Sequence, residues 1–163
     1  MKTFRAHVVL LLCALVGLDD ASAAQTLSLS WRTSGGSLVA ERQVAVAELE
    51  AFPPFHIDTT TPWTRGRQAF DGPSLLDLSR LFPGEIKEAR VEALNDYSAA
   101  IPAEDMTYSG PILATRRNKL SMPVRDKGPF WIIYPMDAEP RFNSATFRER
   151  MVWQVKSIEF IVR

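Results

Sequence analysis

The sequence predicts an α+β domain of mostly antiparallel or mixed β-sheet with a few short helices. Two observations carry this prediction. Apolar and polar residues alternate in short segments along most of the chain, and the helical period of about 3.6 residues is clear at only one place. No internal repeat, low-complexity tract or linker divides the chain, so we expect a single domain with one core.

The first residues have the pattern of a secretory signal peptide. Lys2 and Arg5 form a basic start, residues 8–16 form an apolar run, and residues 21–23 offer a small-residue cleavage site. The apolar run is shorter than the roughly 20 residues that a membrane-spanning helix needs. We therefore expect residues 1–23 to be removed on export to the periplasm, which leaves residues 24–163 as the domain.

Composition limits the classes of function. The 19 basic and 19 acidic residues give a formal net charge of zero, so the chain lacks the basic field that nucleic acid would require. The single cysteine, Cys13, lies in the expected signal peptide. The exported domain then has no thiol and must be held together by packing, which a hydrophobic content of 46% makes feasible.

In the first half of the domain, strands alternate with short helical segments. Apolar residues alternate with serines at 27–31, and a Gly-Gly turn leads back into a strand at 38–46. One helical turn is predicted at 47–51, and a strand at 55–61 that ends at the next proline. A helix is predicted to begin at Pro73 and to stop at a Pro-Gly pair. Its apolar face consists of Leu75, Leu76, Leu78 and Leu81.

In the second half, alternation at 89–93 and 97–101 around an Asn-Asp turn indicates a hairpin. Further strands are predicted at 111–115, which runs into a polar tip, and at 130–134, and a short helix is predicted at 144–150.

The last strand changes phase along its length. Trp153 and Val155 share one face, but the apolar set resumes at Ile158. A β-bulge near Ser157 would reconcile the two halves.

His56 and Asp58 lie two positions apart on a predicted strand and so face the same way, which would suit a base and its orienting carboxylate. The domain has no second histidine and no cysteine to complete a metal site, and no nucleophile-elbow motif. We interpret the pair as a polar strand face, and we predict no catalytic or metal-binding residues.

Trp63 follows a strand and precedes a loop that contains Arg65 and Arg67. A tryptophan at such a place either caps the core or offers a stacking surface for a flat heterocycle. In the second case the two arginines could meet a polar or anionic edge of that ligand.

Asn95, Asp96 and Tyr97 form a turn signature, which has a purely structural use. Asp96 also suits another task, because a carboxylate can accept two parallel N–H bonds from the amino-pyrimidinone edge of a pterin or guanine. Tyr97 would add a second aromatic surface.

Arg125, Asp126 and Lys127 lie between Pro123 and a Gly-Pro pair, directly before an apolar strand. Core packing does not need charges there, and the prolines stiffen the loop, as is typical of a binding site. We therefore expect these three residues to contact a small polar ligand.

In their order along the chain, these motifs resemble the molybdopterin-binding oxidoreductase domain, which has the sulfite oxidase fold. The resemblance covers nearly all of the domain. The segments that carry it are Phe70-Asp71-Gly72-Pro73, Ala93-Leu94-Asn95-Asp96-Tyr97, Ile101-Pro102 with Asp105, Ile112-Leu113-Ala114-Thr115, Gly128-Pro129, Ile132-Ile133-Tyr134-Pro135 and Trp153-Gln154-Val155-Lys156-Ser157-Ile158.

The chain departs from this family at one important place. In the enzymes, a cysteine thiolate before the leucine-rich helix coordinates molybdenum, whereas residues 58–64 here contain threonines and no cysteine. A threonine hydroxyl is a poor substitute for a soft thiolate. The chain is similar instead to short exported members of the fold, some of which bind a free pterin and act on a membrane-bound cyclic-di-GMP enzyme.

The resemblance implies a periplasmic, non-enzymatic protein whose ligand is a reduced free pterin rather than the molybdenum cofactor. Its partner would be the periplasmic domain of a membrane-bound diguanylate cyclase or phosphodiesterase. The implied pterin contacts are Trp63 and Tyr97 as aromatic walls, Asp96 or Asp126 for the donor edge, and Arg125 or Lys127 for the carbonyl. Two alternatives stay open: a molybdopterin-dependent oxidoreductase or a subunit of one, and a protein-interaction module without a ligand.

Overall fold

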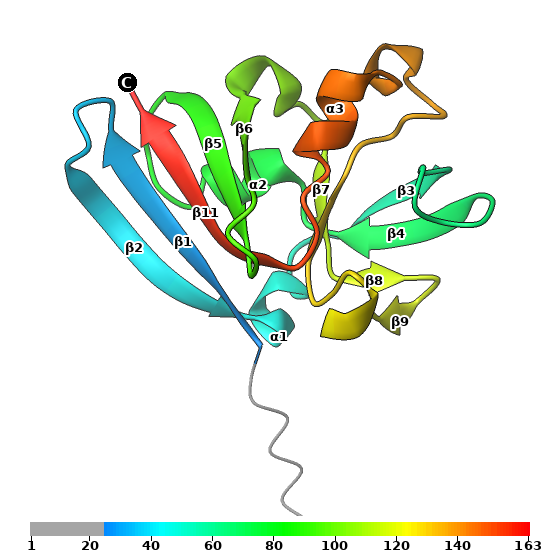
Figure 1. Ribbon diagram of the computed structural model, residues 1–163. Helices are drawn as coiled ribbons and strands as arrows, with labels where there is room; N and C mark the ends of the chain where they lie inside the picture. The colour runs from blue at the N-terminus through cyan, green and yellow to red at the C-terminus, as the bar shows by residue number, and fades with distance from the viewer. Residues whose placement is uncertain (1–24) are drawn as a thin grey trace, which may run out of the picture.

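Residues 25–163 are described by a computed structural model, shown as a ribbon in Figure 1. The predicted signal peptide, residues 1–23, lies outside the described residues. Among the residues that are described, no helix is long and apolar enough to cross a membrane.

The largest element is a five-stranded mixed sheet, in which blue β1 and red β11 lie side by side in Figure 1. The first and last strands of the domain, β1 and β11, are parallel neighbours at the centre, and all other pairs in the sheet are antiparallel. The mainly β, mixed-sheet architecture with few helices confirms the predicted class. In spatial order the strands are β2 (Leu38–Ala45), β1 (Thr26–Thr33), β11 (Val155–Val162), β5 (Ile86–Ala93) and β6 (Ser98–Pro102).

The bulge predicted in the last strand is present. The pairing of β11 with β5 shifts register between Val155 and Ser157. After the shift Ile158 and Phe160 face the core together with Leu27 and Leu29 of β1. The phase change in the sequence is therefore a real change of strand face.

A four-stranded sheet and a two-stranded sheet lie beside the main sheet. The strand predicted at 55–61 ends two residues early, and the strand at 68–72 was not predicted. The polar tip at 116–119 is a small hairpin that pairs with it. The strands of the four-stranded sheet are β3 (Phe55–Thr59), β4 (Gln68–Gly72), β8 (Arg116–Arg117) and β9 (Leu120–Ser121), and those of the two-stranded sheet are β7 (Ile112–Ala114) and β10 (Trp131–Ile133).

The helices are short, as predicted, but the leucine-rich helix begins later than expected. Pro73 precedes the helix, and Ser74 is the N-cap, because its hydroxyl accepts a hydrogen bond from the Asp77 amide at 2.9 Å. The helices are α1 (Val46–Leu49), α2 (Leu75–Ser79) and α3 (Ala145–Arg150), with 3₁₀ turns η1 (Ala103–Asp105), η2 (Val124–Asp126) and η3 (Pro140–Phe142).

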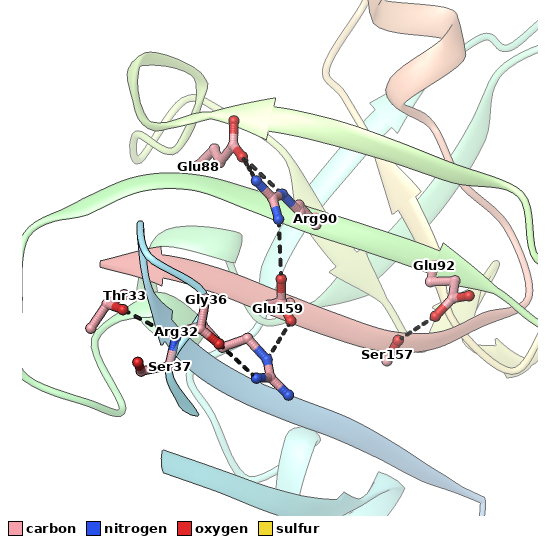
Figure 2. A network of polar contacts seen from close by, with 9 residues as sticks. All are labelled: Arg32, Thr33, Gly36, Ser37, Glu88, Arg90, Glu92, Ser157 and Glu159. Atoms are coloured by element: carbon pink, nitrogen blue, oxygen red, sulfur yellow. Dashed lines mark hydrogen bonds and ion pairs between the residues drawn. The ribbon is translucent and has the colours of Figure 1, made fainter. Parts of the chain in front are cut away.

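The two faces of the main sheet differ in character. On the inner face, buried Trp31 stacks on Phe160 at 5.6 Å and donates its indole N–H to the Ser79 carbonyl of α2. On the outer face a chain of ion pairs crosses three strands, with Arg32 and Arg90 both bound to Glu159, as Figure 2 shows. These pairs are partly exposed and contribute at most about 1 kcal/mol each, so the apolar inner face stabilises the domain.

A buried polar network holds α3 against the rest of the domain. The carboxylate of Asp105 accepts hydrogen bonds from the Tyr134 hydroxyl at 2.9 Å and from the Arg150 guanidinium at 2.7 Å. Burial, together with the Asp105 carboxylate, raises the pKa of Tyr134, which stays a neutral donor. The end of α3 is thus tied to η1 and to the residue after β10.

Candidate functional site

A cavity of about 280 Å³ lies between the end of α3, the β5–β6 turn and the loop after β3. Of the eight predicted binding residues, Trp63, Asn95 and Tyr97 line it. The full lining consists of Trp63, Ala93, Asn95, Tyr97, Arg148, Glu149, Met151, Val152 and Trp153.

Two half-buried tryptophans form one wall of the cavity. The rings of Trp63 and Trp153 are 5.2 Å apart, with an interplanar angle of 71°. Behind them the buried Trp131 lies edge-on to Trp153, at 6.4 Å. The Trp131 indole donates to the Met151 carbonyl at 3.1 Å, and the Ile132 amide donates to the Val152 carbonyl at 2.8 Å. Strand β10 therefore holds the segment that carries Trp153.

The β5–β6 turn forms the opposite wall. The Asn95 side-chain oxygen accepts the Tyr97 amide at 3.3 Å, which closes an Asx turn, and Asp96 between them has a φ of 65°. The Tyr97 hydroxyl donates to the Glu149 carbonyl at 2.9 Å. This bond joins the turn to α3 at the cavity.

Asp96 and Arg65 do not line the cavity. The carboxylate of Asp96 is 82% exposed and binds the Lys156 ammonium at 2.6 Å, a hydrogen bond that lowers the pKa of Asp96. Arg65 lies in the exposed loop after Trp63, where its carbonyl accepts a hydrogen bond from the Gln68 side chain. The sequence left two roles open for Asp96, a structural one in the turn and binding of a ligand's donor edge. Asp96 is poorly placed for the second role in this cavity.

The charged loop lies beside the cavity rather than in its lining. Both carboxylate oxygens of Asp126 are taken by the Arg117 guanidinium, which holds the pKa of Asp126 below its ordinary value. The Lys127 ammonium lies 5.7 Å from the ring centre of Trp131 and 6.0 Å from that of Trp153, within cation–π distance of both. Arg125 is exposed and does not line the cavity.

Sequence reasoning missed the contribution of the α3 region to the cavity. Trp153 was assigned only to a strand face, although a tryptophan just before a strand could have indicated a ligand surface. Arg148 and Glu149 lie on a polar helix with no periodic signal. The Arg148 guanidinium binds the Asn143 side chain at 2.9 Å.

His56 lies between two carboxylates on the four-stranded sheet and does not line the cavity. Its Nδ1 is 2.8 Å from Asp71 and its Nε2 is 3.3 Å from Asp58, so the predicted common facing of His56 and Asp58 is confirmed. The hydrogen bond with Asp71, supported by Asp58, raises the pKa of His56. Within residues 25–163 no group of histidine and carboxylate side chains is arranged to hold a metal ion.

The threonines at the place where the resemblance would put a metal-binding cysteine make bonds within the protein. The Thr60 hydroxyl donates to Asp137 at 2.7 Å, and the Thr61 and Thr64 hydroxyls are paired at 2.9 Å. Hard oxygen donors already engaged in this way do not fit a protein-ligated molybdenum, which takes a soft thiolate.

Comparison with known proteins supports the fold alone. No family model and no curated protein matches the chain. Among solved structures, the chain is similar to the sulfane dehydrogenase SoxCD from Paracoccus pantotrophus, with a TM-score of 0.57 and 12% sequence identity. The similarity covers 84% of this chain but 38% of that one. It shows that this chain has a similar fold, in agreement with the fold that the sequence motifs predicted.

Proposed function

We propose that this chain is a periplasmic, non-enzymatic protein that binds a pterin in the cavity between Trp63, Tyr97 and Trp153. The observation that carries the proposal is the cavity itself, which has aromatic side chains on both walls and polar groups at its rim. The fold of the chain is similar to that of a sulfane dehydrogenase. Its sequence motifs resemble the molybdopterin-binding domain, for which a pterin ring is a natural ligand.

The size and lining of the cavity suit a small flat ring system. Its volume of about 280 Å³ is at the lower end of ligand pockets, which suits a bicyclic heterocycle better than a dinucleotide. Stacking of a base on an aromatic side chain is worth about 1–3 kcal/mol. Two tryptophans could therefore supply much of the affinity without any charged contact.

The proposed role is recognition rather than catalysis. The threonine hydroxyls that replace the thiolate are engaged with Asp137 and with one another, which leaves no suitable protein ligand for molybdenum. By resemblance to the short exported members of the fold, the pterin-loaded protein would act on the periplasmic domain of a membrane-bound cyclic-di-GMP enzyme.

A molybdopterin-dependent oxidoreductase, or a subunit of one, is the second candidate, and the likeness to a sulfane dehydrogenase favours it. The metal would then be held by the dithiolene of its cofactor alone. Elemental analysis of the protein purified from its native compartment decides between the two, because stoichiometric molybdenum would replace our proposal with this one.

The direct test is calorimetric titration of residues 25–163 with a reduced pterin under anaerobic conditions. We expect saturable binding, and we expect Trp63→Leu to weaken it at least about tenfold, or 1.4 kcal/mol. Trp153→Leu should have a similar effect, because each ring forms part of the same wall. The matched control is Tyr108→Leu, which removes an exposed aromatic ring outside the cavity.

Thermal unfolding of each variant separates loss of binding from loss of fold. Absence of binding heat with every pterin tried, oxidised or reduced, would overturn the proposal. So would equal affinities for the wild-type protein and both tryptophan variants.

A further inference from the structure

Glu149 is the single acidic residue in the cavity lining. It lies on the last turn of α3, and its carboxylate makes no hydrogen bond or ion pair with any other residue in the described range 25–163. The two carboxylates expected from the sequence to meet a ligand are already bound, Asp96 to Lys156 and Asp126 to Arg117. An acceptor for donor groups of a ligand is thus available at Glu149.

The backbone at Glu149 is held in place from two sides. Its carbonyl accepts the Tyr97 hydroxyl at 2.9 Å, and the next residue, Arg150, binds the buried Asp105 carboxylate at 2.7 Å. Arg148 on the preceding position binds Asn143 and does not neutralise Glu149. The starting point of the side chain is therefore fixed at the cavity, while the carboxylate itself stays unpaired.

A second polar group faces the same cavity from the β5–β6 turn. The Asn95 oxygen accepts the Tyr97 amide, while the side-chain NH₂ group of Asn95 donates to no other residue within 25–163 and is open to a ligand. The rim thus combines a carboxylate acceptor with an amide donor, the complement of a ring edge that carries adjacent N–H donors and a carbonyl.

From this arrangement we infer that Glu149 determines ligand specificity by accepting two parallel N–H bonds from a 2-amino-4-oxopyrimidine edge. This inference rests on the proposed pterin-binding function and names the part of the ring that is recognised. Pterins and guanine share that edge, and a carboxylate is its bidentate partner. Asn95 would donate to the neighbouring 4-oxo group.

Lumazine is the sharpest probe of this inference, because it differs from pterin in having a 2-oxo group in place of the 2-amino group. A carboxylate that binds the pterin edge would face a carbonyl oxygen in lumazine, which removes one hydrogen bond and opposes two acceptors. A site that hydrogen-bonds one substituent rejects the analogue lacking it because its own polar group is left unpaired. Since Glu149 is exposed, we expect a modest preference for pterin, at least about tenfold in Kd.

The test is to measure Kd for pterin and for lumazine with the wild-type protein, Glu149→Gln and the control Glu104→Gln. A glutamine presents one acceptor and one donor, which match the N–H and carbonyl of lumazine. We therefore expect Glu149→Gln to lose or invert the preference. Glu104 is exposed and does not line the cavity, so Glu104→Gln should keep the wild-type ratio.

The outcomes separate this inference from the proposed function. If the wild-type protein binds pterin and lumazine equally, or if Glu149→Gln keeps the wild-type preference, the role of Glu149 is wrong while pterin binding stands. If the wild-type protein binds neither ligand, the role of Glu149 is wrong, and if it also gives no binding heat with any reduced pterin, the proposed function fails as well. Loss of the preference in Glu149→Gln with lumazine binding retained supports the inference and shows that the variant is folded.

Discussion

Replacement of Asp105 by alanine is expected to lower the free energy of unfolding by about 3 kcal/mol. The Asp105 side chain is 6% exposed and accepts hydrogen bonds from Tyr134 and Arg150. Its removal leaves the buried Tyr134 hydroxyl unpaired, at a cost of about 1–3 kcal/mol, and breaks an ion pair that costs about 3–5 kcal/mol when fully buried. The Arg150 side chain is 21% exposed and can regain water, so its ion pair contributes less than a fully buried one and the total stays near 3 kcal/mol.

Thermal and urea unfolding measure this loss. For a domain of this size, about 3 kcal/mol corresponds to a decrease in Tm of roughly 10 °C. Tyr134→Phe removes a single donor with little change in volume and should cost about 1 kcal/mol. The control is Tyr108→Phe, which removes an exposed hydroxyl that accepts from Arg80 and should change stability by less than about 0.5 kcal/mol.

A double-mutant cycle completes the experiment. Because Asp105 and Tyr134 are in direct contact, the effects of Asp105→Ala and Tyr134→Phe should not add, with a coupling energy of at least about 0.5 kcal/mol. An Asp105→Ala variant within about 1 kcal/mol of the wild type would refute the reasoning, since the network would then not hold α3 in place.

Two further predictions concern the four-stranded sheet. His56 should titrate by NMR above its ordinary pKa of 6.5, and Asp71→Asn should lower that pKa. Because the pKa is higher in the folded state, the stabilisation is complete below pH 6.5 and is lost as pH rises through the folded pKa; an unshifted titration would contradict this. Gly72→Ala should destabilise by about 3 kcal/mol in urea unfolding, because its Cβ would lie 2.0 Å from the Leu113 carbonyl oxygen. Gly35→Ala, where the nearest atom is 3.7 Å away, is its control, and equal effects of the two changes would rule out the clash.

Local patterns in the sequence predicted much of the main sheet. Alternation at 27–31, 89–93 and 97–101 corresponds to β1, β5 and β6, and the change of phase before Ile158 corresponds to the bulge in β11. These features depend on which side of a strand each residue faces, and that is a property of neighbouring residues.

The strand at 68–72 could not be predicted in the same way. It is short, half polar and ends in a glycine; one partner, β3, is the preceding strand, but the other, β8, comes from a distant part of the chain. Its extended conformation results from pairing on both sides rather than from its own residues.

The candidate site was predicted only where a local sequence pattern marks its residues. Trp63 and the Asn95–Tyr97 turn were recognised from an aromatic residue in a loop and from a turn signature, and both line the cavity. Asp96 was expected to contact the ligand beside them. Its backbone is left-handed, and its side chain binds Lys156 rather than lining the cavity. Asp126 was expected to meet the ligand, but Arg117 of the neighbouring hairpin binds it.

The sequence by itself determined the mixed α+β class and the absence of a cysteine from residues 58–64, because these follow from composition and local order. Tertiary structure decided which carboxylate is available to a ligand. Asp96 and Asp126 are paired with Lys156 and Arg117, whereas the Tyr97–Glu149 and Asp105–Arg150 bonds bring Glu149 to the cavity. Apart from the local Asp126–Arg117 pair, these contacts join residues 45 or more positions apart, and only packing of the whole domain brings them together.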